Sequence, residues 1–126
     1  MSLLKKLFFD AKEKRRLALL LAKEERLNQK KRAGFARQRA KEIARWLKDC
    51  HQVKAVYLFG SLARDKFCRW SDIDLYVVGL PRKARCRGVI AEAENKAAPF
   101  KIDIVIEEEA PDHIKKAALE EGELLS

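Results

Sequence analysis

The feature that most constrains this chain is a Gly-Ser pair that interrupts one apolar run and precedes two aspartates in a second. Residues 53–59 form the first run, Gly60-Ser61 ends it, and Asp72 and Asp74 lie two positions apart in the second. On a β-strand, positions i and i+2 project from the same face, so the two carboxylates are expected side by side. Like charges this close repel unless a cation lies between them, and Mg²⁺ prefers carboxylate oxygens. The spacing therefore predicts a site for a metal ion and a phosphate.

A third carboxylate occurs in another strand-like run. Asp103 stands alone among the apolar and β-branched residues of 100–106. An isolated aspartate in an apolar strand is costly unless it is paired or metal-bound. If this strand lies beside the one that carries Asp72 and Asp74, three carboxylates converge. Such a set is sufficient to hold two metal ions about 3.5–4 Å apart for an in-line phosphoryl displacement.

These motifs resemble a known family. The order Gly60-Ser61-Leu62-Ala63-Arg64, then Ser71-Asp72-Ile73-Asp74-Leu75, then Asp103 is similar to the signature of the minimal nucleotidyltransferases. That family belongs to the DNA polymerase beta-like superfamily and consists of small partners of HEPN-domain proteins. The resemblance covers residues 53–106 in order.

The resemblance implies a role for each matched residue. Asp72, Asp74 and Asp103 are the expected catalytic residues and Mg²⁺ ligands, with ATP as the substrate. The expected nucleotide-binding residues are Gly60, Ser61, Arg64 and Ser71; the first two would receive phosphates at the start of a short helix, where free N–H groups favour anions. One departure is Asp65, where the family usually has glycine. Aspartate tolerates left-handed backbone, but its charge near a triphosphate is expected to weaken nucleotide binding.

Composition indicates a soluble, single-domain protein. The chain has 126 residues, of which 48% are hydrophobic and 37% charged. It has no apolar run of about 18 residues, so we expect no membrane span, and the apolar beginning is interrupted by Asp10 without a cleavage site. We therefore expect a cytoplasmic protein, in which Cys50, Cys68 and Cys86 are reduced thiols.

Charge is distributed unevenly between the two parts of the chain. Residues 1–50 contain 16 Lys and Arg against 6 Asp and Glu, whereas residues 51–126 contain 12 against 13. Leucines at three- and four-residue steps predict a basic amphipathic helix in an N-terminal extension over 1–33, before a catalytic core over 34–126. The basic face has three interpretations: a solvated surface, a docking surface for a partner protein, or a nucleic-acid contact, the last not favoured because no nucleic-acid motif accompanies it.

The remaining pattern predicts an α/β fold. We expect a break or a kink near Gly34, a helix to about residue 48, a crossover helix over 82–98 and a final helix from Pro111 or Asp112. With the three strand-like runs, these elements predict a small mixed sheet of three or four strands with helices packed mainly on one face, as in the polymerase beta-like nucleotidyltransferases. Trp70 is expected to pack rather than to stack on a base.

Three functions remain open from the sequence. The first is a metal-dependent nucleotidyltransferase that moves AMP from ATP to a hydroxyl group, with a HEPN-type toxin as acceptor and the chain as antitoxin. The second is a non-catalytic, antitoxin-like binding module. The third is a small-molecule nucleotidyltransferase of the aminoglycoside type, which would need a partner or a homo-oligomer to complete its acceptor pocket.

Overall fold

The chain divides into two units, Met1–Lys31 and Arg32–Ser126. The computed structural model describes residues 11–83 and 88–126. Cys86 and part of the crossover segment predicted over 82–98 lie outside the described residues.

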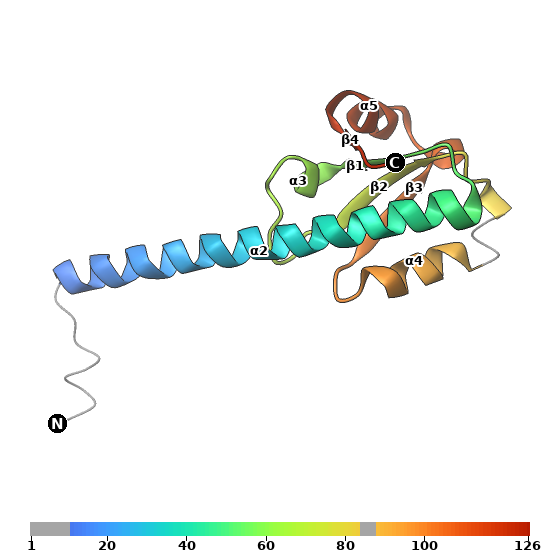
Figure 1. Ribbon diagram of the computed structural model, residues 1–126. Helices are drawn as coiled ribbons and strands as arrows, with labels where there is room; N and C mark the ends of the chain where they lie inside the picture. Colours follow the sequence, from blue (N-terminus) through green and yellow to red (C-terminus); the bar gives the residue numbers. More distant parts are fainter. Residues whose placement is uncertain (1–10, 84–87) are drawn as a thin grey trace. The chain divides into compact units, whose positions relative to one another are not determined.

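The second unit is built on a four-stranded mixed sheet (Figure 1). Its strands are β1 (Ala55–Phe59), β2 (Ile73–Val78), β3 (Ile102–Ile106) and β4 (Glu123–Leu124), in the order β3-β2-β1-β4. β1 pairs antiparallel with β2 and with β4, whereas β2 and β3 are parallel. The predicted α/β fold with a small mixed sheet is therefore confirmed.

Alternation along the strands gives the sheet two different faces. Ile73, Leu75 and Val77 of β2 belong to the main buried cluster, which also contains residues of α2 (Ala11–His51) and α4 (Val89–Ala97). Tyr76 points to the opposite face and forms a smaller cluster with Ala118 of α5 (Asp112–Glu121). Figure 1 shows α4 and the part of α2 in this unit on one side of the sheet and α5 on the other. Two helices thus cover one face, and the second face is left with room for polar groups.

Helix α2 is continuous, and the break expected near Gly34 is wrong. Glycine inside a helix costs about 1 kcal/mol relative to alanine. Here its neighbours are strong helix formers, and the turns that follow bury one side of the helix. The buried residues are Ala36, Ala40, Ile43, Ala44 and Leu47. Packing of this face outweighs the local preference of a single glycine.

Helix α4 begins later than predicted. Gly88 precedes it with φ +77°, a left-handed conformation that does not belong inside a right-handed helix. The helix that crosses from β2 to β3 therefore starts at Val89 and ends at Ala97. Helix α5 starts at Asp112 directly after Pro111, as the sequence predicts.

Residues 11–31 of the first unit form the beginning of α2 and are exposed apart from the half-buried Gln29. Exposed leucines occur on this segment at positions 17, 19, 20, 21 and 27. Within the described ranges, no helix has the length and apolarity needed to cross a membrane.

Candidate active site

Asp74 and Asp103 lie at the same level of the sheet. They are register partners across the parallel strands β2 and β3. Asp72 precedes Asp74 by two positions, just before β2 begins. Because residues of one strand alternate between the two faces of the sheet, Asp74 lies on the same face as Tyr76. The main buried cluster lies on the opposite face. The two strand carboxylates that the sequence predicted to be neighbours are therefore brought together.

The surroundings of Asp74 disfavour its charge. Its register partner on β1 is Phe59, a buried aromatic residue. Burial, together with the charges of Asp103 and Asp72 and against a lowering effect of Arg64, raises the pKa of Asp74 from its ordinary 3.8 to about 6. Repulsion and loss of water both favour the neutral acid, so a cation near these carboxylates would stabilise the ionised form.

Gly60 leaves the space that the Asp74 carboxylate uses. It begins the short helix α3 (Gly60–Ala63) with φ +76°, in the left-handed region. A Cβ atom added to Gly60 would lie 2.2 Å from Oδ2 of Asp74, a distance that real Cβ atoms do not adopt. Sequence reasoning assigned Gly60 to close approach by a phosphate. The structure shows a different requirement, because the glycine is needed for the carboxylate of Asp74.

Ser61 and Arg64 lie on the same turn. The carbonyl oxygen of Ser61 accepts a hydrogen bond from the Lys66 amide at 2.8 Å. Nε of Arg64 donates to the Gly60 carbonyl at 3.3 Å, and the Arg64 charge lies close enough to Asp74 to lower its pKa. Ser61, Arg64 and Gly60 are thus held on one turn next to Asp74.

Ser71 closes the turn that leads into β2. Its Oγ accepts a hydrogen bond from the Cys68 amide at 3.1 Å, and its own amide donates to the Cys68 carbonyl at 3.0 Å. The Ser71 hydroxyl also lies 3.2 Å from Sγ of Cys68, and this hydrogen bond lowers the pKa of the thiol. Ser71 therefore shapes the entry of the chain toward Asp72.

Trp70, on the same turn, does not pack into the protein as expected. Its side chain is 83% exposed. Its ring lies beneath the guanidinium of Arg69, 5.5 Å from the ring centroid. Its neighbours Cys68 and Arg69 are exposed as well, so this turn lies at the surface and the prediction of a packing role is wrong.

Arg37 contacts the α3 turn, although it lies far from this turn in the sequence and no local pattern predicts the contact. From α2, it donates to the Leu62 carbonyl at 3.0 Å and to Oδ1 of Asp65 at 3.4 Å, and it also pairs with Glu123 of β4. Asp65 has φ +56°. This left-handed conformation agrees with the glycine that the family usually has at this position. Sequence reasoning missed Arg37, because its partners lie far away in the sequence and only the fold brings them together.

The donor set fits a hard cation held jointly with a substrate. Within residues 11–83 and 88–126, no group of three or more His, Cys, Asp or Glu side chains is arranged to hold a metal ion by itself. Mg²⁺ is commonly bound through one or two carboxylates, with the remaining positions filled by water and substrate phosphates. Asp74 and Asp103, adjacent in register, provide such a pair of carboxylates.

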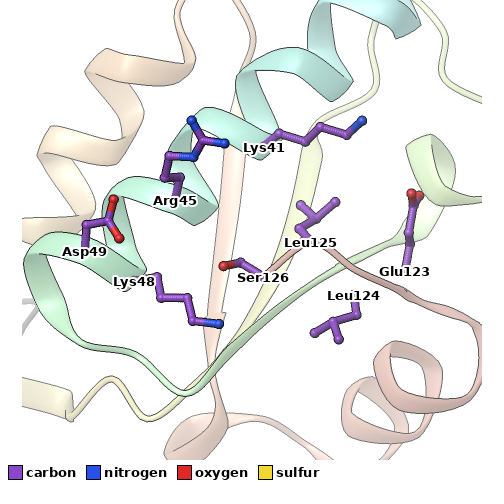
Figure 2. A pocket seen from close by; sticks show the side chains of 8 residues that line it. All are labelled: Lys41, Arg45, Lys48, Asp49, Glu123, Leu124, Leu125 and Ser126. Atoms are coloured by element: carbon purple, nitrogen blue, oxygen red, sulfur yellow. The ribbon is translucent and has the colours of Figure 1, made fainter.

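A separate hollow lies away from these residues. Figure 2 shows it between α2 and the C-terminal segment, with Glu123 at one end and Ser126 between the strand and the helix. Its volume is about 380 Å³. Its lining residues are Lys41, Arg45, Lys48, Asp49, Glu123, Leu124, Leu125 and Ser126. It is therefore distinct from the carboxylate site.

Comparison with known proteins agrees with this fold and shows the family. The family described as "Polymerase beta, Nucleotidyltransferase" matches residues 41–126. A crystal structure of a toxin-antitoxin with AMP-PNP is similar with a TM-score of 0.57 and 23% identity, covering 68% of this chain and 72% of that chain. A crystal structure of a mutant of the toxin-antitoxin MntA-HpeT, with two aspartates replaced by glutamates, has a TM-score of 0.57 and 24% identity, covering 68% and 70%. No curated protein matches the chain.

Proposed function

We propose, because the chain belongs to the polymerase beta nucleotidyltransferase family, that it transfers a nucleoside monophosphate to a hydroxyl group in a metal-dependent reaction. AMP from ATP is the favoured group, and the acceptor is a hydroxyl on a partner toxin. The chain would act as a cytoplasmic antitoxin. Residues 1–126 would work as one domain, with an extension over 1–33 and a catalytic core over 34–126.

The observation that carries this proposal is the register pairing of Asp74 with Asp103 beside the α3 turn. Two carboxylates that repel each other, one of them with a raised pKa, form a poor structural pair. They are well suited to a site that is completed by a cation and a triphosphate. We assign Asp72, Asp74 and Asp103 as ligands of Mg²⁺, with a second ion expected when the nucleotide is bound.

The α3 turn supports a role for its residues in holding the nucleotide. We assign Gly60, Ser61, Arg64 and Ser71 to nucleotide binding, either by direct contact or by shaping the turns on each side of the carboxylates. When bound, Mg²⁺ would neutralise charge on the phosphates. The acceptor oxygen forms a bond to the α-phosphorus, the bond from that phosphorus to the bridging oxygen of the β-phosphate breaks, and pyrophosphate leaves. The hydroxyl proton passes to a carboxylate or to water. Positioning and charge neutralisation lower most of the barrier in such reactions.

Two observations support a toxin as the acceptor. The similar solved structures are of toxin-antitoxin assemblies, one of them with AMP-PNP and the other with a double aspartate mutant. The motif order of this chain resembles the minimal nucleotidyltransferases, whose partners are HEPN-domain proteins. A partner of the HEPN type is therefore the acceptor that we propose.

A second candidate is a binding module without catalysis. The exposed leucines of residues 11–31 favour it, since exposed apolar residues gathered on one segment commonly mark a contact surface. In this alternative the carboxylates would be dispensable for antitoxin action. We rank it second because a pure binding module has no need for adjacent carboxylates at Asp74 and Asp103.

The test measures nucleotide binding and toxin binding separately. AMP-PNP affinity is determined by calorimetry with and without Mg²⁺ for the wild type and for Asp74→Asn, with the exposed Asp112→Asn as a matched control. Complex formation with the protein encoded by the neighbouring gene is measured on the same samples. The proposal expects Mg²⁺-dependent binding that only Asp74→Asn loses. Tight complexes for all three proteins without any nucleotide binding would instead support the binding module.

A further inference from the structure

Arg37 joins three segments of the second unit through one side chain. From α2 it donates to the Leu62 carbonyl of α3, pairs with Asp65 after that helix, and pairs with Glu123 of the edge strand β4. Its side chain is 27% exposed, so part of its charge is withdrawn from water into these contacts.

The α3 turn needs external support because it is short. It has four residues, from Gly60 to Ala63, and a helix of this length gains little from its own hydrogen bonds. The amides of Arg64 and Lys66 donate to the carbonyls of Gly60 and Ser61. The Leu62 carbonyl receives the Arg37 guanidinium at 3.0 Å, and a cation at this end of a helix is favourable. Arg37 therefore anchors the turn to α2.

Asp65 makes the same arginine necessary for a second reason. It adopts φ +56°, and its carboxylate is 87% exposed. A pair this exposed contributes little to stability by itself. Its charge nevertheless lies next to Arg64, on the turn proposed to meet a triphosphate. The Arg37 guanidinium, 3.4 Å from Oδ1 of Asp65, offsets that charge.

We propose that Arg37 is a positioning residue for the nucleotide site, one that anchors the α3 turn and offsets the charge of Asp65. This inference rests on the proposed nucleotidyl transfer. This role of Arg37 explains how the chain keeps the turn with aspartate at position 65, where glycine would adopt the same conformation without such support. Removal of Arg37 leaves the α3 turn without this anchor and leaves the Asp65 carboxylate without its counter-charge, directly after Arg64 in the chain.

The test is a double-mutant cycle on AMP-PNP affinity in the presence of Mg²⁺. The variants are Arg37→Ala, Asp65→Gly and both together, with Arg39→Ala as control, since Arg39 pairs with Glu42 one turn away on the same helix. We expect Arg37→Ala to raise the Kd about tenfold, the effect of losing one charged hydrogen bond, and Arg39→Ala to leave it unchanged. Asp65→Gly should restore part of the affinity in the Arg37→Ala background. If the double variant binds no more tightly than Arg37→Ala, Arg37 does not offset the charge of Asp65, and this part of the inference is overturned.

A second measurement separates this inference from the proposed function. Hydrogen exchange of the amides of residues 60–66 is followed without nucleotide, and Arg37→Lys provides a folded variant if Arg37→Ala is unstable. Faster exchange in both variants, limited to this turn, supports the positioning role. If this result is obtained and the wild type binds no nucleotide, it is the proposed function that fails. Unchanged exchange in folded variants overturns the positioning role.

Discussion

The Cβ atom that Gly60 lacks would lie 2.2 Å from Oδ2 of Asp74. The start of α3 and the middle of the carboxylate site are therefore one packing unit. The Gly-Ser turn and the Asp-x-Asp motif, separate in sequence, constrain each other directly. A substitution at either residue is expected to alter the conformation of the other.

Gly60→Ala is expected to destabilise the protein and to displace the Asp74 carboxylate. Alanine in a left-handed conformation costs about 1–2 kcal/mol, and the overlap with Asp74 adds about 1 kcal/mol or more. Thermal or denaturant unfolding measures the sum. Gly88→Ala is the matched control, because Gly88 has nearly the same φ, +77°, and no atom of residues 11–83 or 88–126 is found within 4 Å of the added Cβ.

The excess cost of Gly60→Ala over Gly88→Ala should disappear when Asp74 is also replaced by alanine. An excess that persists in the Asp74→Ala background would mean that the packing against this carboxylate is not the cause.

Asp74→Asn is expected to stabilise the metal-free protein at neutral pH. The folded-state pKa of about 6 exceeds the ordinary 3.8, so the folded wild type holds a proton where the unfolded chain has lost it. The stability contributed by this proton is complete below pH 3.8 and is lost as the pH rises through about 6. The raised pKa corresponds to at most about 3 kcal/mol, and partial exposure reduces the expected gain at pH 7 to about 1–2 kcal/mol.

The measurement is urea unfolding of the wild type and of Asp74→Asn with a chelator at several pH values between 4 and 8. The difference in stability should grow across the range in which Asp74 ionises. A variant that is less stable than the wild type at pH 7 would show that Asp74 is instead a structural hydrogen-bond partner.

Mg²⁺ is expected to reverse this difference. A cation between the carboxylates removes the repulsion that raises the pKa of Asp74, and protons compete with it below about pH 6. The melting temperature of the wild type in AMP-PNP should rise with Mg²⁺ at pH 7.5 and rise less at pH 5. The same titration on Asp74→Asn is the control, and an equal rise in both proteins would exclude Asp74 as a ligand.

Gly34→Ala is expected to stabilise the protein by about 0.5–1 kcal/mol. Gly34 lies inside the continuous α2, and in the described part of the chain no neighbouring atom lies within 4 Å of an added Cβ. Chemical denaturation provides the measurement. Destabilisation by this substitution would indicate that the helix bends at Gly34 and that the glycine is required there.

Much of this architecture could be predicted from local pattern. The apolar runs around Asp74 and Asp103 predicted two strands, and the neighbouring position that the sequence analysis left as a condition is the one that the structure shows. The helix after Pro111 followed from its start signal. These features depend on periodicity within a single segment, which is visible in the chain itself.

Other features depend on contacts between distant segments. Arg37 looks like any basic residue of a helix until the fold brings Leu62, Asp65 and Glu123 to it. The strand β4 has only two residues and leaves no alternating pattern to detect. The need for Gly60 beside a carboxylate arises from the pairing of three elements and has no local signal.

The most direct test of the account is the intact mass of both proteins after incubation with Mg²⁺ and ATP. The wild type, Asp74→Asn and Asp103→Asn are each incubated alone and with the protein encoded by the neighbouring gene. The account predicts the gain of one AMP on the partner, with the wild type only. Transfer that persists in either variant would contradict the assignment of the carboxylate pair, and no transfer by a wild type that binds its partner tightly would contradict the proposed enzyme.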